Sequence, residues 1–538
     1  MSTAMTELSQ PTLACPPTDD EKYSYIRGAQ HRWFFWAHFL SFAGIAVSFY
    51  GFARMTYWTL IFLLPLTIYA GETLLGLYTS TFRRRVSLTD HLAVVELWAP
   101  KRYPSVDIFI PTCGEALAVL ENTYRYTTLI DYPGTVNVYV LDDANRPEVR
   151  VAAGYHGFHY FARPGSAFKK AGNLQYAFER TSGDHILILD ADFVPRADVL
   201  TEVVPYMDDD PHVGIIQTPQ YYPSRTKGMG WIERCAAATQ EMFYRFIQPS
   251  RDAVEATICC GTSALYRRIA LDKSDGFPQI SHSEDVFTGF NMIEHGYRTA
   301  FVAVNVTQGL CPDHIDPYIS QQYRWCEGSM ELLKMSKFHR HGQITNKQRA
   351  SYWSGFFYYI TTAINGFFAP IPLLIMVWLF PQYVRPSNFL PLVGLMVLWL
   401  VVYPALMRNK WRLDVIRVQT IYGFTHAVAI YDMFFGEQSE WVPSGGSNRA
   451  TPLAVKVKLI MGTYLTVSMV AVLSGVIYRL TQSQYSLRNW YALLIFLGIN
   501  LYIFVPVIWQ CLSTLRTDWQ STHRSAQKRR AVLIGSSK

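Results

Sequence analysis

The sequence predicts an α/β domain, built on a mixed and mostly parallel sheet, that is inserted between two groups of membrane-spanning helices. Three observations predict this fold class. Apolar stretches long enough to cross a bilayer occur on both sides of a central segment, and no comparable stretch occurs from Val86 to Arg349. Inside that segment, short β-rich runs alternate with helical patterns. Such alternation indicates βαβ units, whose strands are parallel.

The composition agrees with a chain that is partly embedded in lipid. Of its 538 residues, 50% are hydrophobic and 15% aromatic, whereas only 17% are charged. The net charge of +7 is not gathered in a Lys/Arg block with interleaved aromatics, so we expect no nucleic acid partner. The eight cysteines include no CxxC pair, which favours a reducing, cytosol-facing location over a disulfide scaffold.

Six apolar stretches reach the roughly 20 residues that a helix needs to cross a bilayer. They are Trp33 to Ala53, Tyr57 to Thr79, Tyr352 to Phe380, Phe389 to Met407, Leu459 to Tyr478, and Trp490 to Leu515. Basic residues flank them, including Arg83-Arg84-Arg85 after the second and Lys528-Arg529-Arg530 after the last. The positive-inside rule therefore predicts a multi-pass protein of the inner (plasma) membrane whose central domain is cytoplasmic.

Three further stretches carry polar residues at helical spacing beside large aromatics: Met229 to Phe246, Ile315 to Lys337 and Val415 to Phe435. We expect amphipathic helices on the membrane surface; surface helices packed on the central domain are the alternative. The predicted organisation is an N-terminal cytoplasmic segment (1–32), two spans (33–82), the α/β domain with interface helices (83–350), two spans (351–412), an interface helix with a loop (413–456), two spans (457–516) and a cytoplasmic tail (517–538).

Each predicted strand of the central domain ends in polar or acidic residues. The strand Val106 to Ile110 is followed by Pro111-Thr112, Val136 to Leu141 by Asp142-Asp143, and Ile186 to Leu189 by Asp190-Ala191-Asp192. Helices are expected between them, over Leu117 to Leu129 and Ala171 to Arg180. Ligands of such sheets bind beyond the carboxyl ends of the strands. We therefore expect these polar residues at a ligand-binding edge.

Asp190 and Asp192 are separated by a single residue. Two carboxylates this close repel each other unless a cation lies near them. Mg²⁺ or Mn²⁺ takes oxygen ligands and keeps coordination positions for substrate phosphates. The pair therefore predicts a divalent cation that binds a nucleoside diphosphate; the alternative is a pair that only caps a turn.

Three more groups of functional residue types follow along the chain. Lys170 opens a helix, where backbone N–H groups and a cation suit an anion. Glu284 and Asp285 supply further acids, and Gln321-Gln322-Tyr323-Arg324-Trp325 places a cation and a large aromatic on the second amphipathic stretch. Each group alone could be a helix cap or a surface charge. Their occurrence together and in this order favours a single site.

This order of motifs resembles the family 2 glycosyltransferases, in particular the processive membrane synthases typified by bacterial cellulose synthase and the curdlan-type β-glucan synthases. The matching segments are DIFIPTCGE, LDDA, KKAGNLQ, DADF, QTPQYY, CCGTSALYRR, SEDV and QQYRW, and the resemblance extends from about Tyr23 to Arg516. It implies a nucleotide-binding GT-A domain on the cytoplasmic face, beside a polysaccharide channel. It also implies an inverting, processive enzyme that polymerises glucose from UDP-glucose and translocates the β-1,3- or β-1,4-glucan across the membrane.

The resemblance implies a role for each matching residue. Thr112, Glu115 and Asp142 or Asp143 would contact the uridine, and Lys170, Gln321 and Arg324 the diphosphate. Asp190 and Asp192 would bind Mg²⁺ or Mn²⁺, with Asp192 the more direct ligand, and Asp190 would also lie at the donor. Asp285 would be the general base, while Trp325, Cys260, Gly261 and Glu284 would contact the acceptor sugar. The implied partners are the UDP-sugar, the growing β-glucan, membrane lipids and an accessory export subunit.

The chain departs from the family pattern at two places. The FxVTxK gating loop is missing, and the stretch from Glu437 to Arg449 stands where the family keeps it. Trp441 and Arg449 are its candidate gating residues; a plain connector is the alternative. No cyclic di-GMP receptor domain is expected in Thr517 to Lys538. The linkage stays open, as do a UDP-N-acetylglucosamine donor, transfer of one sugar to a lipid carrier, and a transporter whose cytoplasmic domain senses nucleotide.

Overall fold

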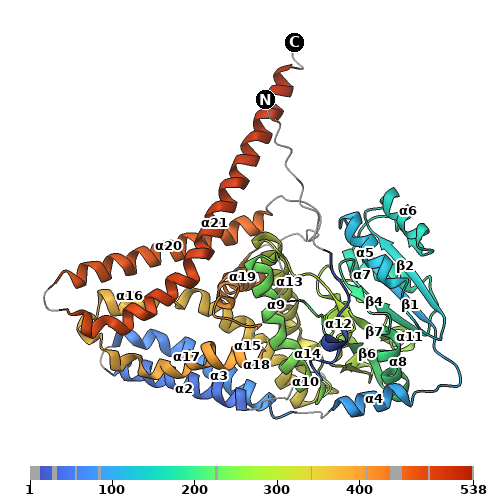
Figure 1. Cartoon of the computed structure of the whole chain (residues 1–538), viewed down its shortest axis with the longest axis horizontal. Coiled ribbons are helices and arrows are strands. Elements are labelled where there is room, and N and C mark those ends of the chain that lie inside the picture. The colour runs from blue at the N-terminus through green and yellow to red at the C-terminus, as the bar shows by residue number, and fades with distance from the viewer. Residues whose placement is uncertain are drawn as a thin grey trace.

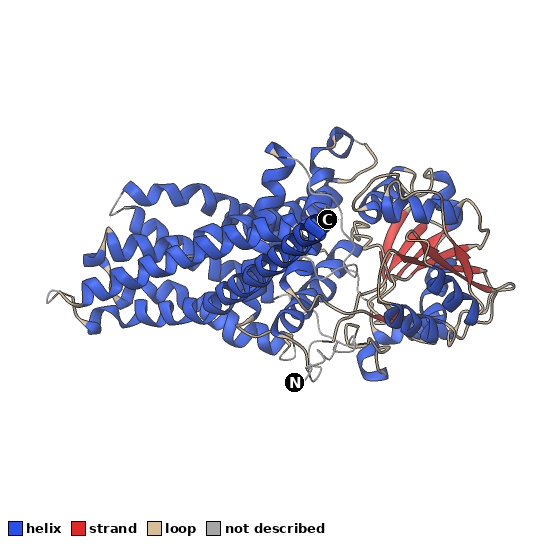
Figure 2. Ribbon diagram, turned by 90° about the horizontal axis from the view of Figure 1, so that it is seen from above, coloured by secondary structure: helices blue, strands red, loops and turns tan. Residues whose placement is uncertain are grey.

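The computed structural model describes residues 13–26, 33–54, 57–82, 86–223, 228–340, 342–407, 410–436, 451–482 and 485–535. An α/β domain and a helical bundle lie side by side (Figures 1 and 2), with the sheet confined to one end of the molecule. This arrangement confirms the predicted fold class, a mostly parallel α/β domain inserted between long apolar helices.

The α/β domain is built on a seven-stranded sheet with the strand order β3-β2-β1-β4-β7-β6-β8. The parallel half of the sheet consists of β1 (Val106–Thr112), β2 (Val136–Asp142), β3 (His159–Phe161) and β4 (His185–Ile188). The other half consists of β6 (Val213–Gln217), β7 (Ala264–Arg267) and β8 (Arg298–Phe301). Strand β7 runs antiparallel to both of its neighbours, which makes the sheet mixed. A small separate sheet pairs β5 (Val194–Pro195) with β9 (Thr307–Gln308).

Helices cover both faces of this sheet (Figure 2), so β1 is buried along its whole length. Alternate residues of β1 therefore enter different cores. Ile108 and Ile110 belong to the core on one face, whereas Phe109 belongs to the core on the other. The first core contains residues of α5 (Leu117–Thr127), α6 (Pro147–Tyr155) and α8 (Val199–Asp209), and the second those of α7 (Lys169–Phe178) and α11 (Arg268–Lys273).

The bundle contains, among the described residues, six helical segments that are long and apolar enough to cross a membrane. These are Trp33–Gly51, Leu60–Thr79, Asn346–Trp378, Pro386–Leu406, Pro452–Leu480 and Leu487–Arg516. They include α2 (Trp33–Ala53), α3 (Leu63–Thr79), α15 (Asn346–Phe368), α16 (Ile371–Trp378), α20 (Pro452–Leu480) and the start of α21 (Leu487–Gly535). The two-plus-four division around the α/β domain agrees with the count predicted from the sequence.

The three stretches predicted as amphipathic are helical and lie between the sheet and the bundle (Figure 1). They form α9 (Trp231–Met242), which continues into a π-helical turn, α13 (Ile315–Lys334) and α19 (Val415–Phe435). Helix α19 packs against α9, α13 and α15. Helix α19 thus contacts both the helices next to the α/β domain and the bundle. Its predicted position on a membrane surface stays a prediction.

A buried ion-pair network stabilises the region where the α/β domain meets the bundle. The Glu241 carboxylate of α9 accepts hydrogen bonds from Lys410 Nζ at 2.7 Å, Tyr25 Oη at 2.9 Å and Arg245 Nη2 at 2.9 Å. Burial alone would raise the pKa of Glu241, but Lys410 and Arg245 lower it below its ordinary value. Breaking a buried pair of this kind by removing one partner typically costs about 3–5 kcal/mol. The network therefore ties the N-terminal segment, the interface helix and the loop before α19 into one unit.

Candidate active site

The carboxyl ends of β1, β2 and β4 meet at one edge of the sheet. Strand β1 lies between the other two and is parallel to both, with Thr112 opposite Asp142 and Phe109 opposite Ile188. The polar residues that follow these three strands therefore come together, as expected from a parallel sheet.

At the end of β1, the Glu115 carboxylate is held by its own turn. Its Oε2 accepts hydrogen bonds from Thr112 Oγ1 at 2.5 Å and from the Cys113 amide at 2.7 Å. Arg146 also stabilises this turn, because it donates hydrogen bonds to Thr112 Oγ1 at 2.9 Å and to the Glu115 carbonyl at 2.6 Å. Arg146 was not predicted as a site residue. Its only sequence signal is a basic residue four positions after Asp142.

The two acids that follow β2 are engaged by different partners. The Asp142 carboxylate accepts from the backbone amides of Ala144 at 3.0 Å and Arg146 at 2.7 Å, and from Tyr160 Oη at 3.0 Å. It therefore shapes the turn after the strand. The uridine contact predicted for this carboxylate remains a prediction.

Asp143 binds Arg163, a second residue that the sequence analysis missed. Arg163 donates Nε and Nη2 to the two carboxylate oxygens at 2.7 and 2.9 Å, and the Asp143 side chain is only 4% exposed. The same guanidinium donates to the carbonyls of Ala167 at 2.7 Å and Lys169 at 2.8 Å. The pair thus shapes the turn that leads into α7, and a uridine contact for Asp143 also remains a prediction.

Lys170 connects three of the predicted groups through one ammonium. Its Nζ lies 2.5 Å from Asp190 Oδ1, 3.0 Å from the Gly261 carbonyl and 3.9 Å from Glu284 Oε1. The two preceding residues, Phe168 and Lys169, have positive φ angles of 57° and 48°, which bulky side chains rarely adopt. Burial alone would lower the pKa of Lys170, but Asp190 and Glu284 raise it. The side chain is therefore a permanent cation between the acids.

The two carboxylates of the DxD motif have unlike surroundings. Asp190 pairs with Lys170, and its amide donates to Thr262 Oγ1 at 2.8 Å. Burial, together with Asp190 and Glu115, raises the pKa of Asp192 to about 7. Asp192 is thus buried beside other negative charges, which Lys170 offsets only in part. No group of three or more metal-ligating side chains occurs among the described residues.

Asp285 lies beneath the loop that carries Gly261. A β-carbon on Gly261, whose φ is +75°, would lie 2.9 Å from Asp285 Oδ2. Glycine is therefore needed here for its backbone angle and for the close approach of the carboxylate. Burial, with a smaller effect of Glu284, raises the pKa of Asp285 to about 7. A carboxylate with this pKa suits the acceptance of a proton near neutral pH.

Helix α13, which carries Gln321, Arg324 and Trp325, packs directly on the turn before Asp285. A β-carbon on Gly328 would collide with both Cβ and Oγ of Ser283, so the helix backbone touches that turn. Burial lowers the pKa of Arg324, and the nearby Glu284 and Asp190 act in the opposite direction. The structure thus brings Arg324 into the acidic group. Gln321 and Trp325 are half-buried on the same helix.

Three glutamines hold the loop that contains Cys260 and Gly261. Gln217 Oε1 accepts from the Cys260 amide at 2.7 Å, and Gln220 Nε2 donates to the Cys260 carbonyl at 2.9 Å. Gln248 binds both backbone groups of Ile258, at 2.7 and 3.1 Å. Gln217 and Gln220 belong to the QTPQYY segment, whose glutamines have no role predicted from the sequence. The two candidate gating residues, Trp441 and Arg449, lie outside the described residues.

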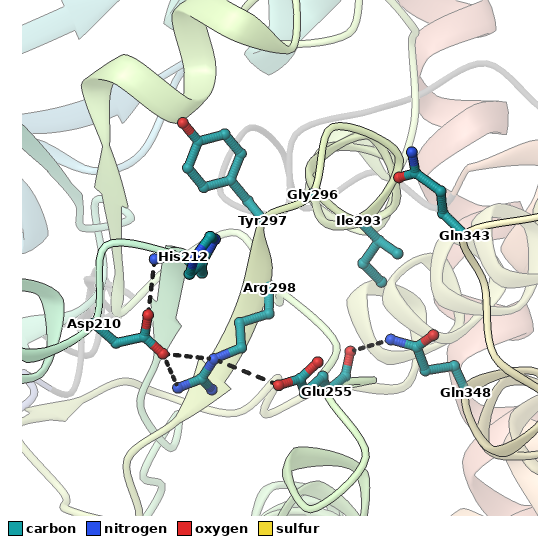
Figure 3. Close-up of a pocket in the computed structure, with 9 residues that line it drawn as sticks. All are labelled: Asp210, His212, Glu255, Ile293, Gly296, Tyr297, Arg298, Gln343 and Gln348. Atoms are coloured by element: carbon teal, nitrogen blue, oxygen red, sulfur yellow. Dashed lines mark hydrogen bonds and ion pairs between the residues drawn. The ribbon is translucent and has the colours of Figure 1, made fainter.

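A polar cavity of about 310 Å³ lies elsewhere in the α/β domain (Figure 3). Its lining contains none of the predicted site residues: Asp210, His212, Glu255, Ile293, Gly296, Tyr297, Arg298, Gln343 and Gln348. Arg298 pairs with Asp210 at 2.8 Å and with Glu255 at 3.8 Å, and Gln348 of α15 donates to the Glu255 carbonyl at 3.1 Å. This cavity therefore lies at a polar contact between the α/β domain and α15, the first helix of the bundle after that domain.

The sequence matches a model of glycosyl transferase family group 2 over residues 185–407. The cellulose synthase 1 catalytic subunit [UDP-forming] of Komagataeibacter xylinus is 35% identical over 282 residues, which cover 51% of this chain and 36% of that protein. The cellulose synthase catalytic subunit [UDP-forming] of Xanthomonas axonopodis pv. citri is 31% identical over 236 residues, which cover 43% of this chain and 32% of that protein. The matched region thus spans about a third of the length of these curated relatives.

Among solved structures, a mannosyltransferase from Pyrobaculum calidifontis in complex with GDP-Man and Mn²⁺ is similar to this chain. Its TM-score is 0.47 at 17% sequence identity, and the match covers 70% of this chain and 99% of that one.

Proposed function

This chain is a family 2 glycosyltransferase related to the catalytic subunits of bacterial cellulose synthases, and we propose that it is a processive, inverting β-glucan synthase that uses UDP-glucose. The resemblance predicted from the motifs is confirmed at the level of the family. The donor, the linkage, processivity and translocation belong to the proposal. The uridine diphosphate of the donor would lie at the carboxyl edge of β1, β2 and β4, against the turn of Thr112 and Glu115.

One observation carries this proposal: Lys170 joins Asp190, the Gly261 loop and Glu284 within 4 Å. Asp190 is a predicted donor position, and Gly261 and Glu284 are predicted acceptor positions, of a single transfer site. A protein that only senses a nucleotide has no need of a buried carboxylate such as Asp285 facing the acceptor loop. The geometry therefore supports a transferase over a nucleotide-sensing transporter.

The proposed transfer is a direct displacement at the anomeric carbon of the donor sugar. Asp285 accepts the proton of the acceptor hydroxyl, whose oxygen forms the new glycosidic bond as the bond to the UDP oxygen breaks. The configuration at that carbon is inverted. Lys170 and Arg324 stabilise the negative charge that develops on the departing diphosphate, and guanidinium geometry suits contact with two phosphate oxygens.

Asp190 and Asp192 fit a divalent cation, Mg²⁺ or Mn²⁺, which would supply further positive charge for the diphosphate. The fit rests on the donor set, because two carboxylates one residue apart after β4 offer the oxygen ligands that a hard cation prefers. Lys170 neutralises Asp190 from the other side. The cation and the lysine would then divide the diphosphate charge between them.

Processivity needs an acceptor contact that holds the sugar without fixing its translation. The face of Trp325, half-buried on α13, is such a contact for the C–H face of a sugar. The six candidate spans would then enclose the path of the β-glucan across the plasma membrane, with the α/β domain in the cytoplasm. Membrane lipids, the growing glucan and an accessory export subunit are the proposed partners.

The test incubates membranes that contain the chain with radiolabelled UDP-glucose or UDP-N-acetylglucosamine and either Mg²⁺ or Mn²⁺. A long, alkali-insoluble glucan from UDP-glucose supports the proposal, and methylation analysis of that product decides between β-1,3 and β-1,4 linkage. A polymer from UDP-N-acetylglucosamine changes the donor. A lipid-linked monosaccharide contradicts processivity, and no transfer from either donor contradicts the proposed function. Asp285→Asn membranes serve as the matched background.

A further inference from the structure

We propose that Arg251 binds the growing glycan as an acceptor-positioning residue just beyond the terminal sugar. This inference rests on the proposed function, since it assigns the acceptor path of the same site. Arg251 lies in α10 (Gln248–Asp252), three residues after the glutamine that holds Ile258. Its side chain was not predicted from the sequence to have any role.

Arg251 is a buried cation without an acidic partner. The residue is 4% exposed, and its Nε and Nη1 atoms are buried without a hydrogen-bond partner. No carboxylate forms an ion pair with it in the part of the chain that the structure describes. The neighbouring Asp252 accepts from the Phe301 amide at 2.8 Å. Burial lowers the pKa of Arg251 to about 10, so the guanidinium stays charged at neutral pH. Leaving such a group unsatisfied is costly.

Two elements that would guide an acceptor, helix α15 and the acceptor loop, lie beside this residue. Its guanidinium lies 5.9 Å from the ring centroid of Tyr352 on α15, and Gly355 of the same helix would place a β-carbon only 3.0 Å from Nη2. The helix that carries Arg251, α10, also holds the acceptor loop, because Gln248 donates to the Ile258 carbonyl at 2.7 Å. Arg251 is thus positioned between the predicted acceptor loop and the start of a membrane span.

Helix α15 also packs against α13. On α13, Ser329 follows Trp325 by four residues and so lies one turn farther along the same helix face. A glycan that stacks its terminal sugar on Trp325 and continues toward the spans would pass this contact between α13 and α15. The next sugars would then meet Arg251.

The groups around the Arg251 guanidinium favour a neutral sugar over an anion as its ligand. Phenol rings offer apolar faces to the C–H faces of sugars, and a guanidinium offers several N–H donors to hydroxyl oxygens. The diphosphate already has Lys170 and Arg324. Because the Arg251 side chain is almost fully enclosed, we infer a ligand that enters between the α/β domain and the spans, as the growing glycan would under the proposed function.

The test replaces the cation by an apolar side chain of similar length, Arg251→Met, in the full chain reconstituted in nanodiscs. Removing an unpaired buried charge should leave the melting temperature equal to or above that of the parent. With UDP present, the affinity for β-1,3- and β-1,4-linked glucose oligosaccharides should fall by roughly 10-fold, the effect of losing one charge-assisted hydrogen bond. Affinity for UDP itself should stay within a few fold, and Arg251→Lys should restore part of the acceptor affinity.

Arg245→Met is the matched control, because Arg245 is equally buried but pairs with Glu241 at 2.9 Å. This variant should lower the melting temperature, which establishes that the assay detects a structural arginine. A comparable fall for Arg251→Met, or parent-like oligosaccharide affinity, overturns the inference while the proposed function stands. If the parent chain transfers no sugar, the proposed function fails, and the acceptor assignment falls with it.

Discussion

Substitution of Gly328 by alanine should separate the QxxRW helix from Asp285, the proposed general base. In the structure, a β-carbon at this position of α13 collides with Cβ and Oγ of Ser283. Rotation of the serine side chain moves Oγ but leaves Cβ in place, so the clash needs a backbone movement. The Ser283 turn has little freedom to give way, because its φ of +54° already lies in the left-handed region. Helix α13 must therefore move away from Asp285.

The expected magnitude follows from that movement. Overpacking of a tight contact by one methyl group costs about 1–3 kcal/mol of stability, which a well-packed α/β domain of this size tolerates. A shift of roughly 1 Å at a catalytic contact can reduce turnover by about 10²-fold. The loss should appear in kcat, because Arg324 and Trp325 move relative to Asp285, while Thr112 and Glu115, the proposed UDP contacts, lie at the end of β1 and in the turn that follows it.

The assay compares Gly328→Ala with Gly154→Ala in the same reconstituted membranes. Gly154 lies in α6, and a β-carbon there would meet nothing within 4 Å, so this control should retain parent turnover and gain slight stability from the better helix former. Thermal unfolding of both variants shows that each is folded. Turnover of Gly328→Ala within twofold of the parent would refute the reasoning, since the close approach of α13 would then have no catalytic consequence.

Four further predictions concern the same site. Asp192→Asn should abolish metal-dependent UDP binding in calorimetry with Mn²⁺, because one anionic ligand is lost; parent-like turnover in EDTA would contradict the metal assignment. Asp285→Asn should keep UDP affinity within a few fold and lower turnover by roughly 10²–10⁴-fold; a collapse of UDP affinity would make Asp285 a donor ligand. Burial and Glu284 raise the pKa of Asp285 to about 7, so its carboxylate form is present above that pH and is lost as the pH falls. Turnover at saturating UDP-glucose should therefore rise between roughly pH 6 and pH 8. A flat pH profile would exclude Asp285 as the base. Trp441→Ala and Arg449→Ala should each reduce turnover strongly with normal membrane insertion if their segment closes over the donor, whereas parent rates for both would make it a connector.

Much of the site could be predicted because its chemistry sits next to regular sequence patterns. Each parallel strand is a short β-rich run, and the residue that follows it must lie at the carboxyl edge of the sheet whatever the rest of the chain does. Asp142, Asp190 and Asp192 were identified in this way, from local sequence alone. The six apolar segments were likewise predicted from length and hydrophobicity, since a helix needs a minimum number of apolar residues to cross a bilayer.

The residues that the sequence analysis missed share another property: their function depends on contacts between distant parts of the chain. Arg163 is 20 residues from Asp143, and Gln217 is 43 residues from Cys260. Arginine and glutamine are common surface residues, so nothing local distinguishes these from solvated side chains. Arg251 is the extreme case, because burial without a partner can be recognised only when all its neighbours are known.

The sequence by itself determined the kinds of groups in this protein, their order along the chain and the edge of the sheet where they stand. Only the tertiary structure decided which of them touch. Lys170 meets the Gly261 carbonyl across 91 residues of sequence, and Phe168, Lys169 and Ser283, which directly precede the residues Lys170 and Glu284, have positive φ angles. Patterns of hydrophobicity report the preferences of short segments in water. Contacts of this kind are stabilised by the packing of the whole domain, which outweighs the local cost of the unusual backbone angles.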